Sequence, residues 1–145
     1  MKKVLILMTF AGLLTSSCGN GEPETRTDFI IKNSSSFDIE LEVFNAWLPN
    51  LRLKDTLIKL AINSEFRYYY NVDGENASYF LPFGYPDSAY IVFSDTQRII
   101  YRRDDLNPRN ILDINSYEGG KVANSYFIYT YYISDEDYEN ALAIK

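Results

Sequence analysis

The chain has 145 residues, enough for one domain and hardly for two, and carries 14 basic and 20 acidic residues but no histidine. The absence of histidine excludes a Ser-His-Asp triad, a Cys-His pair and a histidine-ligated zinc site. A single cysteine excludes an internal disulfide and a cysteine-rich metal site. Because the net charge is −6, we expect no nucleic-acid partner.

The N-terminus has the pattern of a secretory signal peptide. Two lysines, Lys2 and Lys3, precede an apolar run of eleven residues, 4–14. As a helix this run would rise about 16 Å, roughly half of a bilayer's hydrocarbon core, which is too short for a stable transmembrane helix. We therefore expect residues 1–17 to be removed during export.

The only cysteine, Cys18, directly follows this segment. Leu14-Thr15-Ser16-Ser17-Cys18 resembles the lipobox of bacterial lipoproteins, in which a lipid is attached to the cysteine thiol and the new N-terminal amine is acylated. Thr15 stands where the usual lipobox has leucine, and Thr15 and Ser17 also suit an ordinary signal peptidase, which would release a soluble product. We expect lipidation at Cys18, because a lone thiol at this position cannot form an internal disulfide. Two or three acyl chains give stable membrane anchoring.

Residues 18–27 are expected to form a lipidated flexible tether. The segment 19–27 contains Gly, Pro and alternating charges but no large apolar residue. Without Lys2 and Lys3 the mature chain carries 12 basic and 20 acidic residues, a charge of −8. A single folded domain is expected from Asp28 to Lys145.

Strands are expected through most of this domain. The segment 29–32 is a short β-type run, and 37–43 alternates apolar and acidic residues at every position, which predicts a strand with one buried and one solvated face. The turn-forming residues 33–36 between them predict that these two strands form a hairpin. Further strands are expected at 57–62, 65–72, 89–93, 98–101, 110–114 and 125–133.

The chain then changes its pattern. Ser134 and Asp137 have the spacing of a capping box, and acidic residues in the first turn suit the helix dipole, so a short helix is predicted from Asp135 to Leu142. Seven or eight short strands with one terminal helix predict an all-β fold, an antiparallel β-sandwich or barrel.

Several segments together resemble a group of small lipoproteins from Bacteroidetes-type bacteria. They are the Lys-Lys signal ending in Ser17-Cys18, an Ile31-x-Asn33-x-Ser35 start, Asn110-Ile111-Leu112 leading to Tyr117, and the ending 133–141 (ISDEDYENA). The resemblance covers most of the mature chain and contains no catalytic signature. It implies a lipid anchor in the cell envelope and favours the outer membrane. Whether the domain faces the periplasm or the cell surface stays open.

Paired carboxylates are the candidates for chemistry, as in a small hydrolase acting on glycans. The pairs are Asp104-Asp105, Glu40 with Glu42, and the acids of 135–137, and each also fits a turn, a solvated strand face or a helix start. The acidic turns 73–76 and 104–107 lack the spacing of a known calcium loop. We therefore expect no enzyme activity, no cofactor and no metal site.

Tyrosine is abundant, with 13 residues, and marks the candidate binding surfaces. The runs 68–70 and 129–132 place rings on both faces of their strands, so the outer face would carry Tyr69 with either Tyr129 and Tyr131 or Tyr132. The loop 79–86, which two prolines stiffen, holds four more rings, Tyr79, Phe80, Phe83 and Tyr85. Exposed rings suit contact with a glycan or an envelope protein, whereas the alternative is that they pack over sheet edges.

Two tripeptides resemble the O-glycosylation sequon of Bacteroidetes. They are Asp55-Thr56-Leu57 and Asp87-Ser88-Ala89, which makes Thr56 and Ser88 candidate glycan sites. The sequence as a whole favours a membrane-anchored, non-catalytic binding or accessory module of the cell envelope, and the hydrolase stays the alternative.

Overall fold

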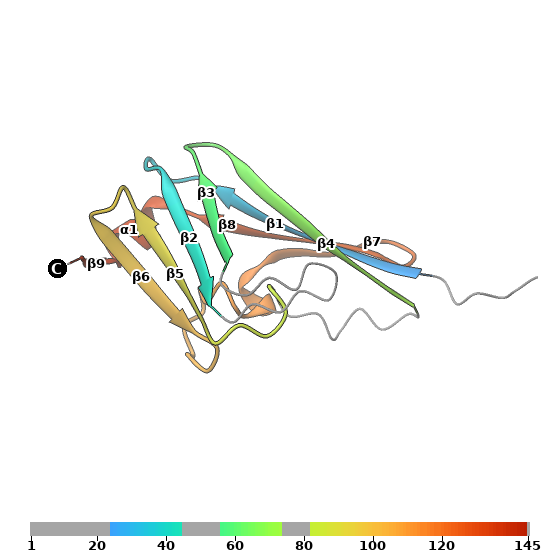
Figure 1. Ribbon diagram of the computed structural model, residues 1–145. Helices are drawn as coiled ribbons and strands as arrows, with labels where there is room; N and C mark the ends of the chain where they lie inside the picture. The colour runs from blue at the N-terminus through green and yellow to red at the C-terminus, as the bar shows by residue number, and fades with distance from the viewer. Residues whose placement is uncertain (1–23, 45–55, 74–81, 145) are drawn as a thin grey trace, which may run out of the picture.

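The computed structural model describes residues 24–44, 56–73 and 82–144, which form two packed β-sheets (Figure 1). Sheet A has the strand order β4-β1-β8-β7 and sheet B the order β3-β2-β5-β6-β9, which confirms the predicted all-β sandwich. The elements are β1 (Glu24–Asn33), β2 (Ile39–Phe44), β3 (Thr56–Leu60), β4 (Glu65–Asp73), β5 (Ser88–Phe93), β6 (Gln97–Arg102), the 3-10 helix η2 (Ile114–Ser116), β7 (Glu118–Ala123), β8 (Tyr126–Ile133), α1 (Asp135–Glu139) and β9 (Leu142–Ala143).

Alternating side chains build the core between the sheets. In β2, Ile39, Leu41 and Val43 are buried while the intervening Glu40 and Glu42 remain partly exposed. Every second residue of β5 is also buried. The period-two pattern of the sequence therefore predicts the inward face of these strands correctly.

The predicted hairpin between the first two strands is wrong. β1 pairs with β4 and β8 in sheet A, whereas β2 pairs with β3 and β5 in sheet B. The turn 34–38 instead carries the chain from one sheet to the other. Its geometry is held by Asn33, whose side-chain amide donates to the carbonyl oxygens of Phe37 (2.8 Å) and Leu60 (3.1 Å). The turn predicted at 33–36 is present, but it connects the two sheets and does not close a hairpin.

Sheet A contains a parallel pair, which departs from the predicted antiparallel arrangement. β1 runs parallel to β8, from Arg26 opposite Tyr126 to Asn33 opposite Ile133. The other strand pairs in the described part of the chain are antiparallel. The first and last long strands of the domain are thus neighbours in the middle of one sheet.

The folded domain begins earlier than the predicted boundary at Asp28. β1 starts at Glu24, and Thr25 and Thr27 are fully buried on its inward face. The last four residues assigned to the tether therefore belong to sheet A, and five residues, 19–23, separate Cys18 from the first strand.

The C-terminal part also differs in detail. α1 ends at Glu139, and Leu142 begins a two-residue strand paired with β6. The predicted strand 110–114 is a series of turns, although Ile111 and Leu112 are buried in the core.

The sequence does not predict β7, because the Gly119-Gly120 pair is unfavourable in a strand. Gly119 is required there: it has a φ of 120°, and a Cβ atom at this position would lie 2.2 Å from the carbonyl oxygen of Ile128. The glycine thus lets β7 approach β8 closely.

An aromatic cluster centred on Phe29 covers the inward face of sheet A. The Phe29 ring stacks on Tyr68 (centroids 5.3 Å apart) and Tyr129 (5.6 Å). It also meets the rings of Tyr70 (5.9 Å) and Tyr117 (5.6 Å) edge-on. Aromatic pairs add stability beyond the area they bury.

Alkaline unfolding is expected from the buried tyrosines. Burial raises the pKa of Tyr101 to about 12 and also raises the pKa values of Tyr68, Tyr70, Tyr117 and Tyr131. Because the folded state favours the neutral phenols, their contribution to stability is complete below the unfolded pKa near 10 and is lost as the pH rises above it. Urea midpoints between pH 8 and pH 12 should fall beyond pH 10, together with a rise in tyrosinate absorbance. Ionisation of these tyrosines with a constant midpoint would contradict the prediction.

Candidate functional site

The outer face of sheet A carries exposed tyrosines. Tyr69 of β4 is 53% exposed and Tyr132 of β8 is 38% exposed. Of the two sets that the sequence left open, Tyr132 lies on the outer face, whereas Tyr131 is buried and Tyr129 stacks on Phe29 in the core. The outer surface is therefore separate from the aromatic core.

A buried carboxylate, Asp28, lies at the centre of this outer face. Its side chain is only 1% exposed, although it points away from the core. Arg26 contacts both its oxygens, with Nε donating to Oδ1 (2.6 Å) and Nη2 to Oδ2 (3.2 Å). The Tyr126 hydroxyl also donates to Oδ2 (3.1 Å), and Arg67 of β4 lies 3.9 Å from the same oxygen. Asp28 thus gathers two arginines and a tyrosine from three neighbouring strands.

The Arg26 guanidinium lies between two aromatic rings. Its carbon is 4.6 Å from the centre of the Tyr69 ring and 5.8 Å from that of Tyr126. The hydrogen bond to Asp28 raises the pKa of Arg26. The pKa of Tyr126 is also raised, mainly by desolvation and secondly by its hydrogen bond to Asp28. We call Arg26, Asp28, Arg67, Tyr69 and Tyr126 the tyrosine–arginine face. Both arginines are about half exposed, which leaves donors and ring edges accessible to a ligand.

The aromatic loop does not form one contact surface. Phe83 is 1% exposed, stacks on Tyr68 at 5.1 Å, and its backbone N–H donates to the Tyr68 hydroxyl (2.9 Å). The prediction that Phe83 binds a ligand is therefore wrong, because its ring belongs to the core. Tyr85 is 53% exposed, with the Arg103 guanidinium 5.1 Å from its ring centre. Tyr79 and Phe80 lie outside the described residues.

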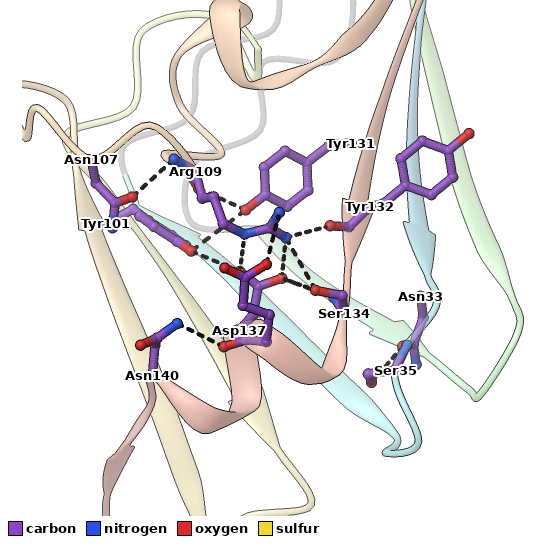
Figure 2. A network of polar contacts seen from close by, with 11 residues as sticks. Asn33, Ser35, Tyr101, Asn107, Arg109, Tyr131, Tyr132, Ser134, Asp137 and Asn140 are labelled. Carbon is purple, nitrogen blue, oxygen red and sulfur yellow. Dashed lines mark hydrogen bonds and ion pairs between the residues drawn. The ribbon is translucent and has the colours of Figure 1, made fainter.

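A second polar cluster joins α1 to the loop after β6 (Figure 2). Asp137 is 1% exposed and accepts from Arg109 Nε at Oδ1 (2.8 Å) and from Nη2 at Oδ2 (2.6 Å). The backbone N–H of Ser134 also donates to Oδ2 (2.8 Å), which confirms the predicted capping box. The Tyr101 hydroxyl approaches Oδ1 at 3.4 Å.

The same arginine ties down the end of β8. Arg109 Nη2 donates to the carbonyl oxygen of Tyr132 (3.0 Å), and the Tyr131 hydroxyl donates to the carbonyl oxygen of Arg109 (2.7 Å). A hollow of about 430 Å³ lies beside this cluster, lined by residues of β6, α1 and the 107–109 loop. Since both oxygens of Asp137 already accept hydrogen bonds from Arg109 and Ser134, we interpret the cluster as structural.

The other candidate carboxylates also have structural contacts. Glu40 forms an ion pair with Lys59 across β2 and β3. Asp105 accepts from the backbone N–H of Arg102 (2.9 Å), and Asp135 accepts from that of Ser36 (2.7 Å). Among the residues that the structure describes, no three or more His, Cys, Asp or Glu side chains are grouped as metal ligands.

The candidate modification sites differ in accessibility. The hydroxyl oxygen of Thr56 is buried, so a glycan on it would displace the atoms that cover it in the folded domain. Ser88 is partly exposed on the outer face of β5. Cys18 lies outside the described residues.

The sequence alone does not mark Arg26 and Asp28 as a site, because its composition places them in the tether and at the domain boundary. The available signal is their spacing: residues i and i+2 of a strand point to the same face, so an Arg-x-Asp sequence in a strand places opposite charges side by side. Arg109 gave no comparable signal, because its partner Asp137 lies 28 residues later.

Comparison of the chain with known protein families, with curated proteins and with solved structures finds no match. In the described ranges, helices with the length and apolar character needed to cross a membrane are not found.

Proposed function

We propose that the chain is a lipid-anchored, non-catalytic binding module of the bacterial cell envelope, held at the outer membrane through Cys18. Its contact surface is the tyrosine–arginine face of sheet A, and its ligand is a glycan. The observation that carries this proposal is the exposed Arg26 guanidinium held by buried Asp28 between the rings of Tyr69 and Tyr126.

The chemistry of this face suits a sugar. Tyrosine rings offer flat, amphipathic surfaces against which the C–H face of a sugar ring can stack. The two arginines supply fixed hydrogen-bond donors beside those rings, and Asp28 orients them before any ligand arrives. Such preorganisation reduces the entropy lost on binding. The structural contacts of Glu40, Asp105 and Asp137 argue against the alternative, a carboxylate-dependent hydrolase.

Replacing Tyr69 with alanine is expected to weaken glycan capture at least tenfold, because it removes an exposed ring that covers Arg26. The Cys18→Ala mature chain would be screened against immobilised neutral and uronate-containing polysaccharides, and the affinity for those captured would be measured. Since Tyr69 is 53% exposed, the melting temperature of the Tyr69→Ala protein should differ from that of the wild type by only a few degrees.

Tyr85→Ala is the matched control for that experiment. Tyr85 is also 53% exposed and also lies against an arginine, but it belongs to the loop before β5. Its replacement should leave capture unchanged. Loss of capture in Tyr85→Ala and retention in Tyr69→Ala would move the site to the loop.

Membrane attachment is tested separately by Cys18→Ala. The wild-type protein should sediment with host membranes and the variant should enter the soluble fraction, because the variant lacks the thiol to which the lipid is attached. A wild-type protein found in the soluble fraction would instead favour cleavage by an ordinary signal peptidase.

A further inference from the structure

The start of β1 and the β7–β8 turn lie at the same end of sheet A. Arg26 is paired with Tyr126, and the backbone N–H of Arg26 donates to the carbonyl oxygen of Ser125 (2.8 Å). Figure 1 shows this end extending beyond sheet B, with the C-terminus at the opposite end of the molecule. We infer that the exposed residues Lys121–Asn124 at the tip of the β7–β8 hairpin rest on the lipid bilayer, an inference that relies on the lipidation of Cys18 proposed above.

The length of the connection limits how the domain can stand on the membrane. Five residues separate Cys18 from Glu24, so the two Cα atoms are at most about 20 Å apart. β1 has ten residues and spans about 30 Å. If the far end of β1 touched the bilayer, Glu24 would lie about 30 Å from the membrane surface. That distance exceeds the reach of the five-residue connection. The inverted orientation is therefore excluded.

The composition of the β7–β8 turn favours contact with the bilayer through this turn over contact through a face of a sheet. The mature chain has 20 acidic residues, but none lies between Gly119 and Ile133, where Lys121 is the only charged residue. Val122 is 56% exposed and lies next to Lys121. An apolar side chain beside a lysine suits the headgroup region, where lysine can extend its ammonium to water. Glu24 is exposed at this end and is paired with Asp73 of β4, so we expect contact with zwitterionic lipid.

The test measures the distance of two labelled positions from the membrane. Lipidated Val122→Cys protein, purified from membranes in detergent, would be labelled with a fluorophore at its new thiol. It would then be reconstituted into vesicles of phosphatidylcholine and phosphatidylethanolamine that carry headgroup nitroxide quenchers. Acylation consumes the thiol of Cys18, so the introduced cysteine is the only reactive one.

Ile62→Cys provides the matched control. Ile62 is an apolar residue of similar exposure, 49%, in the β3–β4 turn, which lies beside Asn33 at the far end of β1. Quenching should be at least severalfold stronger at position 122 than at position 62. Vesicle-bound protein with equal quenching at both positions, or stronger quenching at 62, would overturn the orientation alone. Protein that fails to float with vesicles and is labelled at Cys18 would overturn the lipid anchor and this inference with it.

Discussion

Replacing Phe29 with alanine is expected to lower the free energy of unfolding by about 3–5 kcal/mol. Phe29 is fully buried and lies at the centre of the aromatic cluster in sheet A. The truncation would leave a cavity and would remove ring contacts with four tyrosines at once. Urea unfolding of wild type and variant, followed by tyrosine fluorescence, measures the difference.

Leu57→Ala is the control for that variant. Leu57 is also apolar and also in a strand, but it is 53% exposed, so its replacement should change the free energy of unfolding by about 0.5 kcal/mol or less. Similar losses in the two variants would mean that the stability of the domain does not depend on the aromatic cluster.

Replacing Arg109 with alanine is expected to cost about 3 kcal/mol of stability. The change leaves the buried carboxylate of Asp137 without its paired charge, which usually costs 3–5 kcal/mol. We expect roughly the lower end of that range, because 34% of the Arg109 side chain is exposed and water can partly replace it. Thermal unfolding at neutral pH should show a melting temperature lower by at least about 10 °C.

Two further variants separate the charge effect from general damage to the loop. Arg98→Ala removes an exposed arginine whose guanidinium carbon lies 5.5 Å from the centre of the Tyr90 ring, so it should cost less than about 1 kcal/mol. Arg109→Met combined with Asp137→Asn should be less destabilised than Arg109→Ala, because no unpaired charge remains buried. A double variant as unstable as Arg109→Ala would contradict the ion-pair explanation.

The sequence predicts the strands better than it predicts their partners. Period-two patterns identify β2 and β5 and their inward residues, because one face of each strand is buried and the other is solvated. The turn 33–36 signals a reversal but not whether the next strand joins the same sheet. Three consecutive buried residues in β1, Phe29, Ile30 and Ile31, are typical of a strand covered on both faces. That run was the available indication of a central position beside a parallel neighbour.

The candidate site depends on the same long-range pairing. The outward position of Tyr69 follows from the alternation within β4. The contact of Asp28 with Tyr126 and Arg67 requires β8 and β4 to lie on either side of β1. No local pattern contains that information, because the partners lie 98 and 39 residues away in the chain. The burial of Phe83 is a comparable case: its ring is held by Tyr68, 15 residues earlier, rather than by its own loop.

The parallel pairing of β1 with β8 also makes the middle of sheet A slow to complete when the protein folds. Arg26 and Tyr126 are 100 residues apart in the chain, so the middle of sheet A closes a loop almost as long as the domain. Loop-closure entropy and high contact order make such pairings slow to form. Because the chain is synthesised from its N-terminus, β1 is made first, yet its pairing edge for β8 stays open until residue 133 has followed. A strand with three adjacent apolar residues and an open edge is prone to aggregate. Correct folding therefore depends on keeping β1 from aggregating until β8 has been synthesised.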